Sequence, residues 1–302
     1  MSLIQLPPRE VSAPAPKVTA QTLLAKKQAH QPITALTAYD YPTARLVDQA
    51  GIDLILVGDS LGMAVLGYDS TLPVTVDEML HHTRAVRRAA RRTLLVADMP
   101  FGSYHASTEQ AITNATRFIK EAGAEAVKIE GGRNRAALVA ALVQAEIPVV
   151  GHIGLTPQSV HRLGYRVQGK TLSAIDDLVA DALALEAAGA LAVVLECVPR
   201  EAAAIITAAL TIPTIGIGAG PECDGQILVF HDLVNLTGAA PAKFVRRYAD
   251  AQTLFTEAIQ HYQRDVTSRH FPADAESYHL PNEISSALLD RELQQPLQRQ
   301  KV

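Results

Sequence analysis

Charged and polar side chains follow the apolar runs of this sequence at several points. They are Asp59 with Ser60, Asp98, Lys128, Glu130, His152 and Glu196. Carboxylates there can bind a cation or accept a proton, and a lysine can bind an anionic substrate. Any single aspartate could instead cap the following helix. Four buried carboxylates at one site would each cost on the order of several kcal/mol unless positive charge lies among them.

These carboxylates predict a magnesium site. Asp59, Asp98 and Glu130 offer only oxygen ligands, which hard cations such as Mg2+ prefer. Zinc would favour clustered histidines or cysteines, whereas His81 and His82 are adjacent on a predicted helix and should point apart. Because Mg2+ keeps open coordination positions, it leaves room for the carboxylate and keto oxygens of a 2-oxo acid.

Glu196 is the candidate general base, because it is remote from the other carboxylates and follows a very apolar run. Lys128 would bind the carboxylate of the 2-oxo acid. A metal ion on the keto oxygen would then stabilise the enolate that forms when the neighbouring carbon loses its proton. Cys197 should point to the opposite face and behave as a small buried hydrophobe. Ser60 lies in GDSLG, which superficially resembles a hydrolase serine motif. We favour a role for its neighbour Asp59 as a metal ligand over a role for Ser60 as a nucleophile.

A repeated pattern of strand and helix would position these residues. Apolar runs that favour strands span residues 33–40, 52–60, 93–100, 126–131, 148–154, 191–199, 213–220 and, more weakly, 226–233. Stretches that favour helices span 43–50, 76–90, 108–122, 133–144, 173–188 and 200–210. The strands start about every 30 residues, as βα units require, and their apolar faces indicate parallel pairing.

We therefore predict a (β/α)8 TIM barrel with its active site at the C-terminal ends of the strands. An open doubly wound sheet is the alternative. Its dinucleotide signature should follow an early strand, whereas the glycine-rich segment 216–220 follows the seventh and lacks the third spaced glycine. We interpret that segment as a tight barrel turn.

The length of 302 residues fits either two domains or one enlarged barrel. The hydrophobic content of 48% allows a large core. We predict a flexible N-terminal tail over residues 1–18, a single barrel with its closing helices over 19–270, and a C-terminal tail over 271–302.

Charge and composition limit the partners. The net charge is −4, and the densest basic group lies on a predicted helix, at Arg84, Arg87, Arg88, Arg91 and Arg92. We interpret it as a solvated or subunit-contacting face, not a nucleic-acid site. No apolar run approaches the roughly 20 residues that span a bilayer, no signal peptide is evident, and two cysteines form no disulfide framework. We expect a cytoplasmic protein without nucleic-acid or membrane partners.

The chain resembles the ketopantoate hydroxymethyltransferase family in a series of ordered motifs. They are TAYD (37–40), VGDSLGM (57–63), GYDSTLPVT (67–75), LLVADMPF (94–101), VKIEGG (127–132), GHIGLTPQSV (151–160), VVLECVP (193–199), IPTIGIGAG (212–220) and CDGQILVFHD (223–232). Together they cover about residues 33 to 245. The segment 161–165 is one residue shorter than the family's double-glycine form, in a loop that could cover the mouth.

The resemblance implies a barrel of the phosphoenolpyruvate/pyruvate superfamily type and a homodecameric assembly. It also implies a reaction in which 5,10-methylenetetrahydrofolate, 3-methyl-2-oxobutanoate and water give tetrahydrofolate and 2-dehydropantoate. It also implies residue roles: Asp59 and Asp98 bind Mg2+, Glu130 joins the metal site through water, and Glu196 accepts the proton. Ser60 and Lys128 would contact the keto acid together with the two aspartates, with Tyr39 and His152 in supporting roles.

Two other readings remain open. A carbon–carbon lyase of the same superfamily would resemble its relatives in carrying a KKCGH-type cysteine motif, which this sequence lacks. A barrel retained as a scaffold or regulator should have lost its site acids, whereas all of the expected acids are present.

Overall fold

The computed structural model describes residues 16–294. Eight parallel strands close into a barrel in chain order, with β8 paired to β1. They are β1 Ile33–Thr37, β2 Leu54–Val57, β3 Leu94–Asp98, β4 Ala126–Glu130, β5 Val149–Gly154, β6 Ala192–Glu196, β7 Thr214–Ile217 and β8 Gly225–Leu228. Each overlaps one of the predicted apolar runs, and the predicted (β/α)8 barrel is confirmed.

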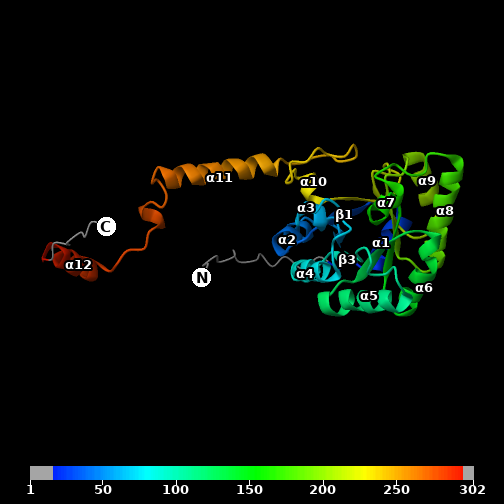
Figure 1. The fold of residues 1–302 in the computed structure, drawn as a ribbon, viewed down its shortest axis with the longest axis horizontal. Coiled ribbons are helices and arrows are strands. Elements are labelled where there is room, and N and C mark those ends of the chain that lie inside the picture. The colour runs from blue at the N-terminus through cyan, green and yellow to red at the C-terminus, as the bar shows by residue number, and fades with distance from the viewer. Residues whose placement is uncertain (1–15, 295–302) are drawn as a thin grey trace. The chain divides into compact units, whose positions relative to one another are not determined.

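Helices between the strands form the outer layer of the barrel (Figure 1). The longer ones are α2 Tyr41–Gln49, α4 Val76–Arg87, α5 Thr108–Ala122, α6 Ala136–Gln144, α8 Leu172–Ala187 and α9 Arg200–Ala209. Shorter ones are α1 Ala20–Gln28, α3 Leu61–Ala64, α7 Val160–Leu163, α10 Phe230–Leu233, and the 3-10 turns η1 Arg133–Arg135 and η2 Pro157–Ser159. N-capping residues determine where four of these helices begin. In each, the capping side chain accepts a hydrogen bond from a backbone N–H of the first turn; the caps are Asp40, Thr75, Ser107 and Thr171.

The alternation of side chains along each strand divides the core into two layers. In β2, Ile55 and Val57 belong to the layer packed under the helices, whereas Leu54 and Leu56 belong to the cluster inside the barrel. Toward the C-terminal strand ends, the inward positions of β3, β4 and β5 change from apolar to charged side chains. This change creates the polar mouth described below.

The chain divides into two compact units, residues 1–249 and 250–302. The first contains the barrel, and the second contains α11 Ala251–Thr267, η3 Asp274–Glu276 and α12 Asn282–Gln294. We expected the barrel domain to continue to residue 270, so the division found here comes earlier. Residues 1–15 of the predicted N-terminal tail lie outside the described residues. Val18, also placed in that tail, is only 2% exposed and donates its N–H to the Arg92 carbonyl.

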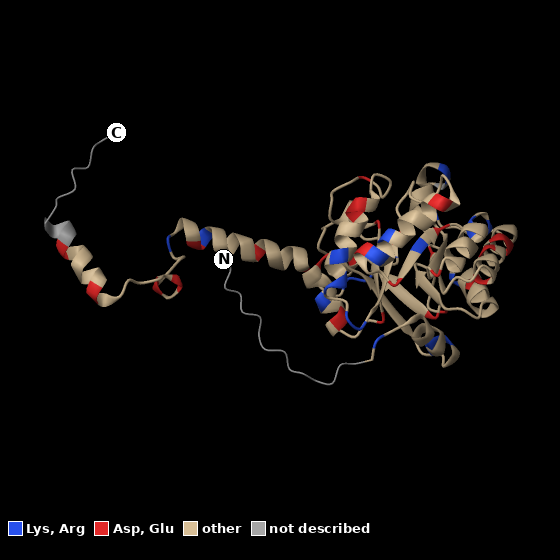
Figure 2. Cartoon of the chain, turned by 90° about the horizontal axis from the view of Figure 1, so that it is seen from below, with Lys and Arg blue, Asp and Glu red and all other residues tan. Residues whose placement is uncertain are grey.

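The predicted arginine-rich helix ends at Arg87, and part of its basic group is charge-paired. Arg84 pairs with Glu121, Arg87 with Glu125, and Arg92 lies 3.6 Å from Asp53. Figure 2 shows acidic and basic residues interspersed over the barrel unit. Within residues 16–294, no helix is both long and apolar enough to cross a membrane.

Candidate active site

A cavity of about 550 Å3 opens at the C-terminal ends of the strands. All of the predicted site residues except Tyr39 line it: Asp59, Ser60, Asp98, Lys128, Glu130, His152 and Glu196. The barrel therefore gathers side chains that are far apart in the sequence, as parallel strands ending at one mouth should.

Strand register places the central charges side by side. Asp98 on β3 pairs with Lys128 on β4, and Glu130 on β4 pairs with His152 on β5. Lys128 and Glu130 are two residues apart and both face the cavity, as the alternation of a strand predicts. Glu196 ends β6, which lies next to β5.

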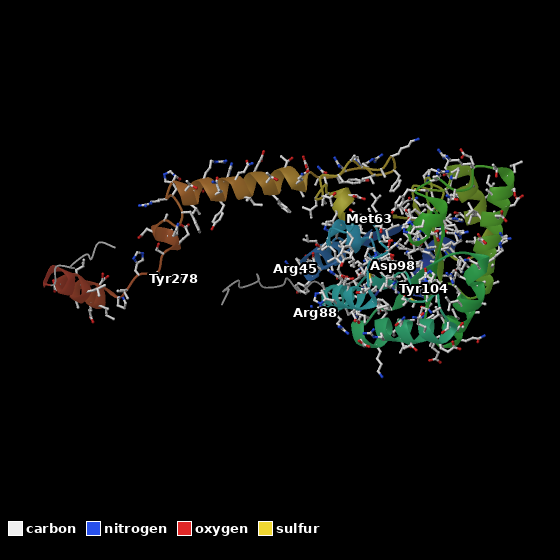
Figure 3. The ribbon with its side chains drawn as sticks, in the orientation of Figure 1. Arg45, Met63, Arg88, Asp98, Tyr104 and Tyr278 are labelled. Carbon is white, nitrogen blue, oxygen red and sulfur yellow. The ribbon has the colours of Figure 1, made fainter. Side chains whose placement is uncertain are left out.

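Asp59 and Asp98 form a buried carboxylate pair. The backbone N–H of Asp59 donates to Asp98 Oδ2 at 3.1 Å. Burial raises the pKa of Asp59 well above its ordinary value, and the charges of Asp98 and Glu130 raise it further. Burial also raises the pKa of Asp98, although Lys128 opposes that rise. Figure 3 shows Asp98 inside the barrel unit.

Lys128 supplies buried positive charge. Its Nζ lies 2.9 Å from Asp98 Oδ1 and 3.2 Å from His152 Nδ1. Burial alone would lower the pKa of Lys128, but the charges of Asp98, Glu130 and Asp59 raise it. The ammonium therefore stays charged beside the carboxylates, although one cation does not balance them all.

His152 connects the buried acids to Glu196. Its Nδ1 is 3.6 Å from Glu130 Oε1, and its Nε2 is 3.3 Å from Glu196 Oε2. Burial and the Lys128 ammonium lower the pKa of His152, but the two glutamates outweigh them and raise it to about 9. The side chain of Glu196 is 18% exposed, more than Glu130 or His152, so Glu196 faces the open part of the cavity.

Gln158 is a central site residue that we did not predict. Its Nε2 donates to Asp59 Oδ2 at 2.8 Å and to the Met99 carbonyl at 3.0 Å, and its backbone N–H donates to Glu130 Oε2. The Tyr104 hydroxyl donates to Gln158 Oε1 at 2.7 Å. Gln158 lies within the GHIGLTPQSV motif, and this motif was the sequence feature that could have identified it as a site residue. Its contacts depend on how the loop after β5 folds back over β3 and β4.

Tyr39 acts on the cavity through Ser60, since their hydroxyls are 2.7 Å apart. Cys197 differs from our expectation, because it lines the cavity instead of pointing away from it. β6 ends at Glu196, and Cys197 adopts a left-handed φ of 49°, which breaks the alternation of the strand. Burial raises the pKa of its thiol to about 11, so the thiol is protonated at neutral pH.

The donor chemistry fits Mg2+. Within the described part of the chain, no three or more His, Cys, Asp or Glu side chains form a ready-made metal cage. Mg2+ does not need one, since it usually binds one or two carboxylates and keeps several waters. Asp59 and Asp98 are such a pair. Burial raises the pKa of both, and neighbouring carboxylates raise it further, so a bound cation would favour their ionised forms. Glu130 is tied to Gln158 and His152, so contact through water suits it best.

Part of the cavity wall is apolar. It comes from β2, β6, β7 and β8, through Leu56, Val194, Ile217 and Ile227. A ligand with a charged head and a branched alkyl end would match this mixed lining.

The sequence pattern of the ketopantoate hydroxymethyltransferase family matches residues 17–274. The 3-methyl-2-oxobutanoate hydroxymethyltransferase of Koribacter versatilis is 68% identical over 251 residues, covering 83% of this chain and 85% of the relative. The enzyme of that name from Gloeobacter violaceus is 60% identical over 242 residues, covering 80% and 93%.

Solved structures with the same fold are much more distant in sequence. A phosphonopyruvate hydrolase solved with oxalate and Mg2+ has a TM-score of 0.57 at 15% identity, covering 91% of this chain and 96% of the other. A 2,3-dimethylmalate lyase, described as a member of the phosphoenolpyruvate mutase/isocitrate lyase superfamily, has a TM-score of 0.55 at 16% identity, covering 93% and 95%. These likenesses agree with the barrel fold. The family pattern and the relatives of high identity show the family: the chain belongs to the ketopantoate hydroxymethyltransferase family.

Proposed function

We propose that this protein transfers a hydroxymethyl group from 5,10-methylenetetrahydrofolate to 3-methyl-2-oxobutanoate, giving 2-dehydropantoate and tetrahydrofolate. The observation that carries the proposal is one cavity that combines Lys128, a buried carboxylate pair, Glu196 at its open part, and apolar walls. A carbon–carbon bond forms between C3 of the acceptor and the donor's methylene carbon, and both carbon–nitrogen bonds of that methylene break. Water supplies the hydroxyl, and the protons from water and C3 end on the folate nitrogens.

The acceptor's polar end belongs at the charged wall. Lys128 binds its carboxylate as a charged hydrogen-bond donor, and the Ser60 hydroxyl, held by Tyr39, adds a second polar contact. The branched alkyl end packs against Val194 and Ile227. This orientation directs C3 toward the open part of the cavity, where Glu196 lies.

Asp59 and Asp98 would hold Mg2+, with Glu130 reaching it through water. When bound, Mg2+ supplies positive charge for the negative charge that develops on the keto oxygen. It would also relieve the repulsion between the buried aspartates.

Glu196 accepts the proton from C3. His152 Nε2 lies 3.3 Å from Glu196 Oε2 and fixes where that carboxylate points. The Leu155 N–H donates to the Glu196 carbonyl, and the Cys197 N–H donates to the Ile217 carbonyl. The backbone on both sides of the base is therefore held in place, as proton transfer requires.

Deuterium exchange at C3 of 3-methyl-2-oxobutanoate tests this proposal. Wild-type protein with Mg2+ should exchange that hydrogen in D2O without any folate. Glu196→Gln should slow the exchange at least about 100-fold, the usual contribution of a general base. A matched control is Glu201→Gln, since Glu201 is an exposed glutamate in the first turn of α9, and it should exchange at the wild-type rate.

Proton NMR gives both rates directly. No exchange by the wild type, or equal exchange by Glu196→Gln, would contradict the proposed role of the cavity. The cytoplasmic location and the homodecamer stay predictions, and light scattering checks the second.

A further inference from the structure

The rim of the active-site cavity carries a group of aromatic and basic side chains that the acceptor does not use. We call Tyr165, Arg166, Lys243 and Phe244 the rim cluster; all four line the cavity. They come from two segments far apart in the sequence, one following α7 and the other following α10. The cluster therefore borders the mouth from the loops after β5 and after β8.

The two aromatic rings offer flat apolar surface at the entrance. Tyr165 is 55% exposed. Burial raises the pKa of its hydroxyl, and the charges of Asp59, Glu196 and Glu130 raise it further. Phe244 is half-buried and packs against Gly218, where an added Cβ would lie 2.7 Å from the ring. That close approach, together with a φ of 65°, accounts for glycine at this position of the GIGAG turn.

The two basic side chains lack acidic partners. No ion pair or side-chain hydrogen bond is found for the Arg166 guanidinium or the Lys243 ammonium within residues 16–294. Several other arginines of the barrel are paired: Arg133, for example, lies 2.7 Å from Asp177 and 2.8 Å from Asp181. Free cations at a cavity entrance are available to an anionic ligand.

Charge changes sign between the floor and the rim of this cavity. The floor holds Asp59, Asp98 and Glu130 around Lys128, whereas the rim offers Arg166 and Lys243. With the acceptor's carboxylate on Lys128, a second ligand finds its unpaired cations at the rim, so its anionic groups belong there and a neutral or cationic group belongs near the floor. A reduced folate has this distribution, with uncharged pterin and aminobenzoyl rings at one end and glutamate carboxylates at the other.

We propose that the rim cluster binds the one-carbon donor. The ring system of the donor stacks on Tyr165 and Phe244, and its glutamate carboxylates pair with Arg166 and Lys243. The reactive methylene, which bridges N5 and N10 between the pterin and the aminobenzoyl ring, then faces inward, toward Glu196. This inference rests on the proposed function, because it assumes a folate as the second substrate.

Binding of tetrahydrofolate, measured by calorimetry with Mg2+ and 3-methyl-2-oxobutanoate present, tests the cluster. The double variant Arg166→Ala/Lys243→Ala should weaken binding about tenfold, the value of two partly exposed ion pairs. The wild type should bind a triglutamate form more tightly than the monoglutamate, and the double variant should lose that preference. Tyr165→Ala should also weaken binding, whereas Tyr165→Phe, which keeps the ring, should bind within about twofold of wild type.

Arg162→Ala is the matched control. Arg162 is an exposed arginine four residues before Arg166, but it lines a neighbouring cavity. It should bind tetrahydrofolate as the wild type does. Unchanged binding by the double variant, or equal weakening by Arg162→Ala, would overturn the assignment of the rim. Folate-free exchange at C3 by wild-type protein separates the two proposals: if it occurs, a failed binding test removes only the rim assignment, and if it does not, the proposed function itself is wrong.

Discussion

The two ends of the barrel use acidic residues in opposite ways. At the N-terminal end, acids directly precede three of the strands, and each pairs with a lysine from the segment before β1. Asp53 lies 2.6 Å from Lys26, Glu125 lies 2.6 Å from Lys17, and Asp224 lies 2.8 Å from Lys27. At the C-terminal end, Asp59, Asp98 and Glu130 share Lys128 and His152. The first arrangement matches each acid with its own cation, and the second concentrates negative charge.

The pKa shifts follow this difference. Burial acts to raise the pKa of Asp53, but the hydrogen bond from Lys26 and those from Thr34 outweigh it and lower the pKa. For Asp59, burial and the neighbouring carboxylates act together and raise it. Ionised Asp53 therefore stabilises the folded chain, whereas ionised Asp59 costs stability. A destabilising carboxylate at the end of the barrel that holds the active site indicates a residue kept for its chemistry.

Asp59→Asn should produce the largest functional change. It removes a proposed ligand of Mg2+, so folate-free exchange at C3 should fall at least about 1000-fold, about 4 kcal/mol in the barrier. The folded state should be as stable as wild type or more so, because the amide oxygen can still accept from Gln158 and repulsion from Asp98 is gone. NMR exchange and thermal unfolding measure the two effects. A large loss of stability would contradict the comparison.

Asp53→Asn should show the reverse pattern. Asp53 is 3% exposed, and its variant leaves Lys26 and Arg92 without their carboxylate. Removing one member of a buried ion pair costs about 3 kcal/mol, whereas the exchange rate at saturating substrate should stay at the wild-type value. Urea unfolding gives the free energy. If activity falls while stability holds, the assignment of this end to stability is wrong.

The barrel could be predicted from the sequence because its signal is repeated. Short apolar runs and amphipathic helices recur at a spacing that only a few architectures allow, and strand alternation then specifies that Lys128 and Glu130 share a face. Acids at strand ends were recognisable for the same reason, since the ends of parallel strands meet at one mouth.

Features that depend on loops could not be predicted in this way. Gln158 reaches Asp59 only because the loop after β5 returns across the mouth. Cys197 enters the cavity through a left-handed φ that alternation does not anticipate. Val18 is buried through a contact with the segment before β3, so a tail rich in proline and small residues ends earlier than its composition indicates.

Mg2+ should stabilise the protein through its catalytic end alone. At ten times its dissociation constant, a ligand that binds only the folded state adds about 1.4 kcal/mol. We expect this increase in wild type and in Asp53→Asn, and its loss in Asp59→Asn. Thermal unfolding with and without Mg2+ measures it, with NaCl at matched ionic strength as the control. An equal increase in all three proteins would place the cation elsewhere.

The pH dependence of the free energy of unfolding should have opposite signs at the two ends of the barrel. This is the smallest of the expected effects. Asp53 has a lowered pKa in the folded chain, so its contribution is complete above the unfolded value of about 4 and is lost as the pH falls through the folded pKa. The destabilisation by Asp53→Asn should therefore shrink in acid.

Asp59 has a raised pKa, so its cost is absent below about 4 and develops as the pH rises through the folded pKa. Any stability gained by Asp59→Asn should thus be greatest near neutral pH and disappear in acid. Urea unfolding of the metal-free proteins, from below the unfolded carboxyl value of about 4 up to neutral pH, measures both differences. Parallel trends of the same sign would mean that both carboxylates are stabilised alike, and the contrast between the two ends would then fail.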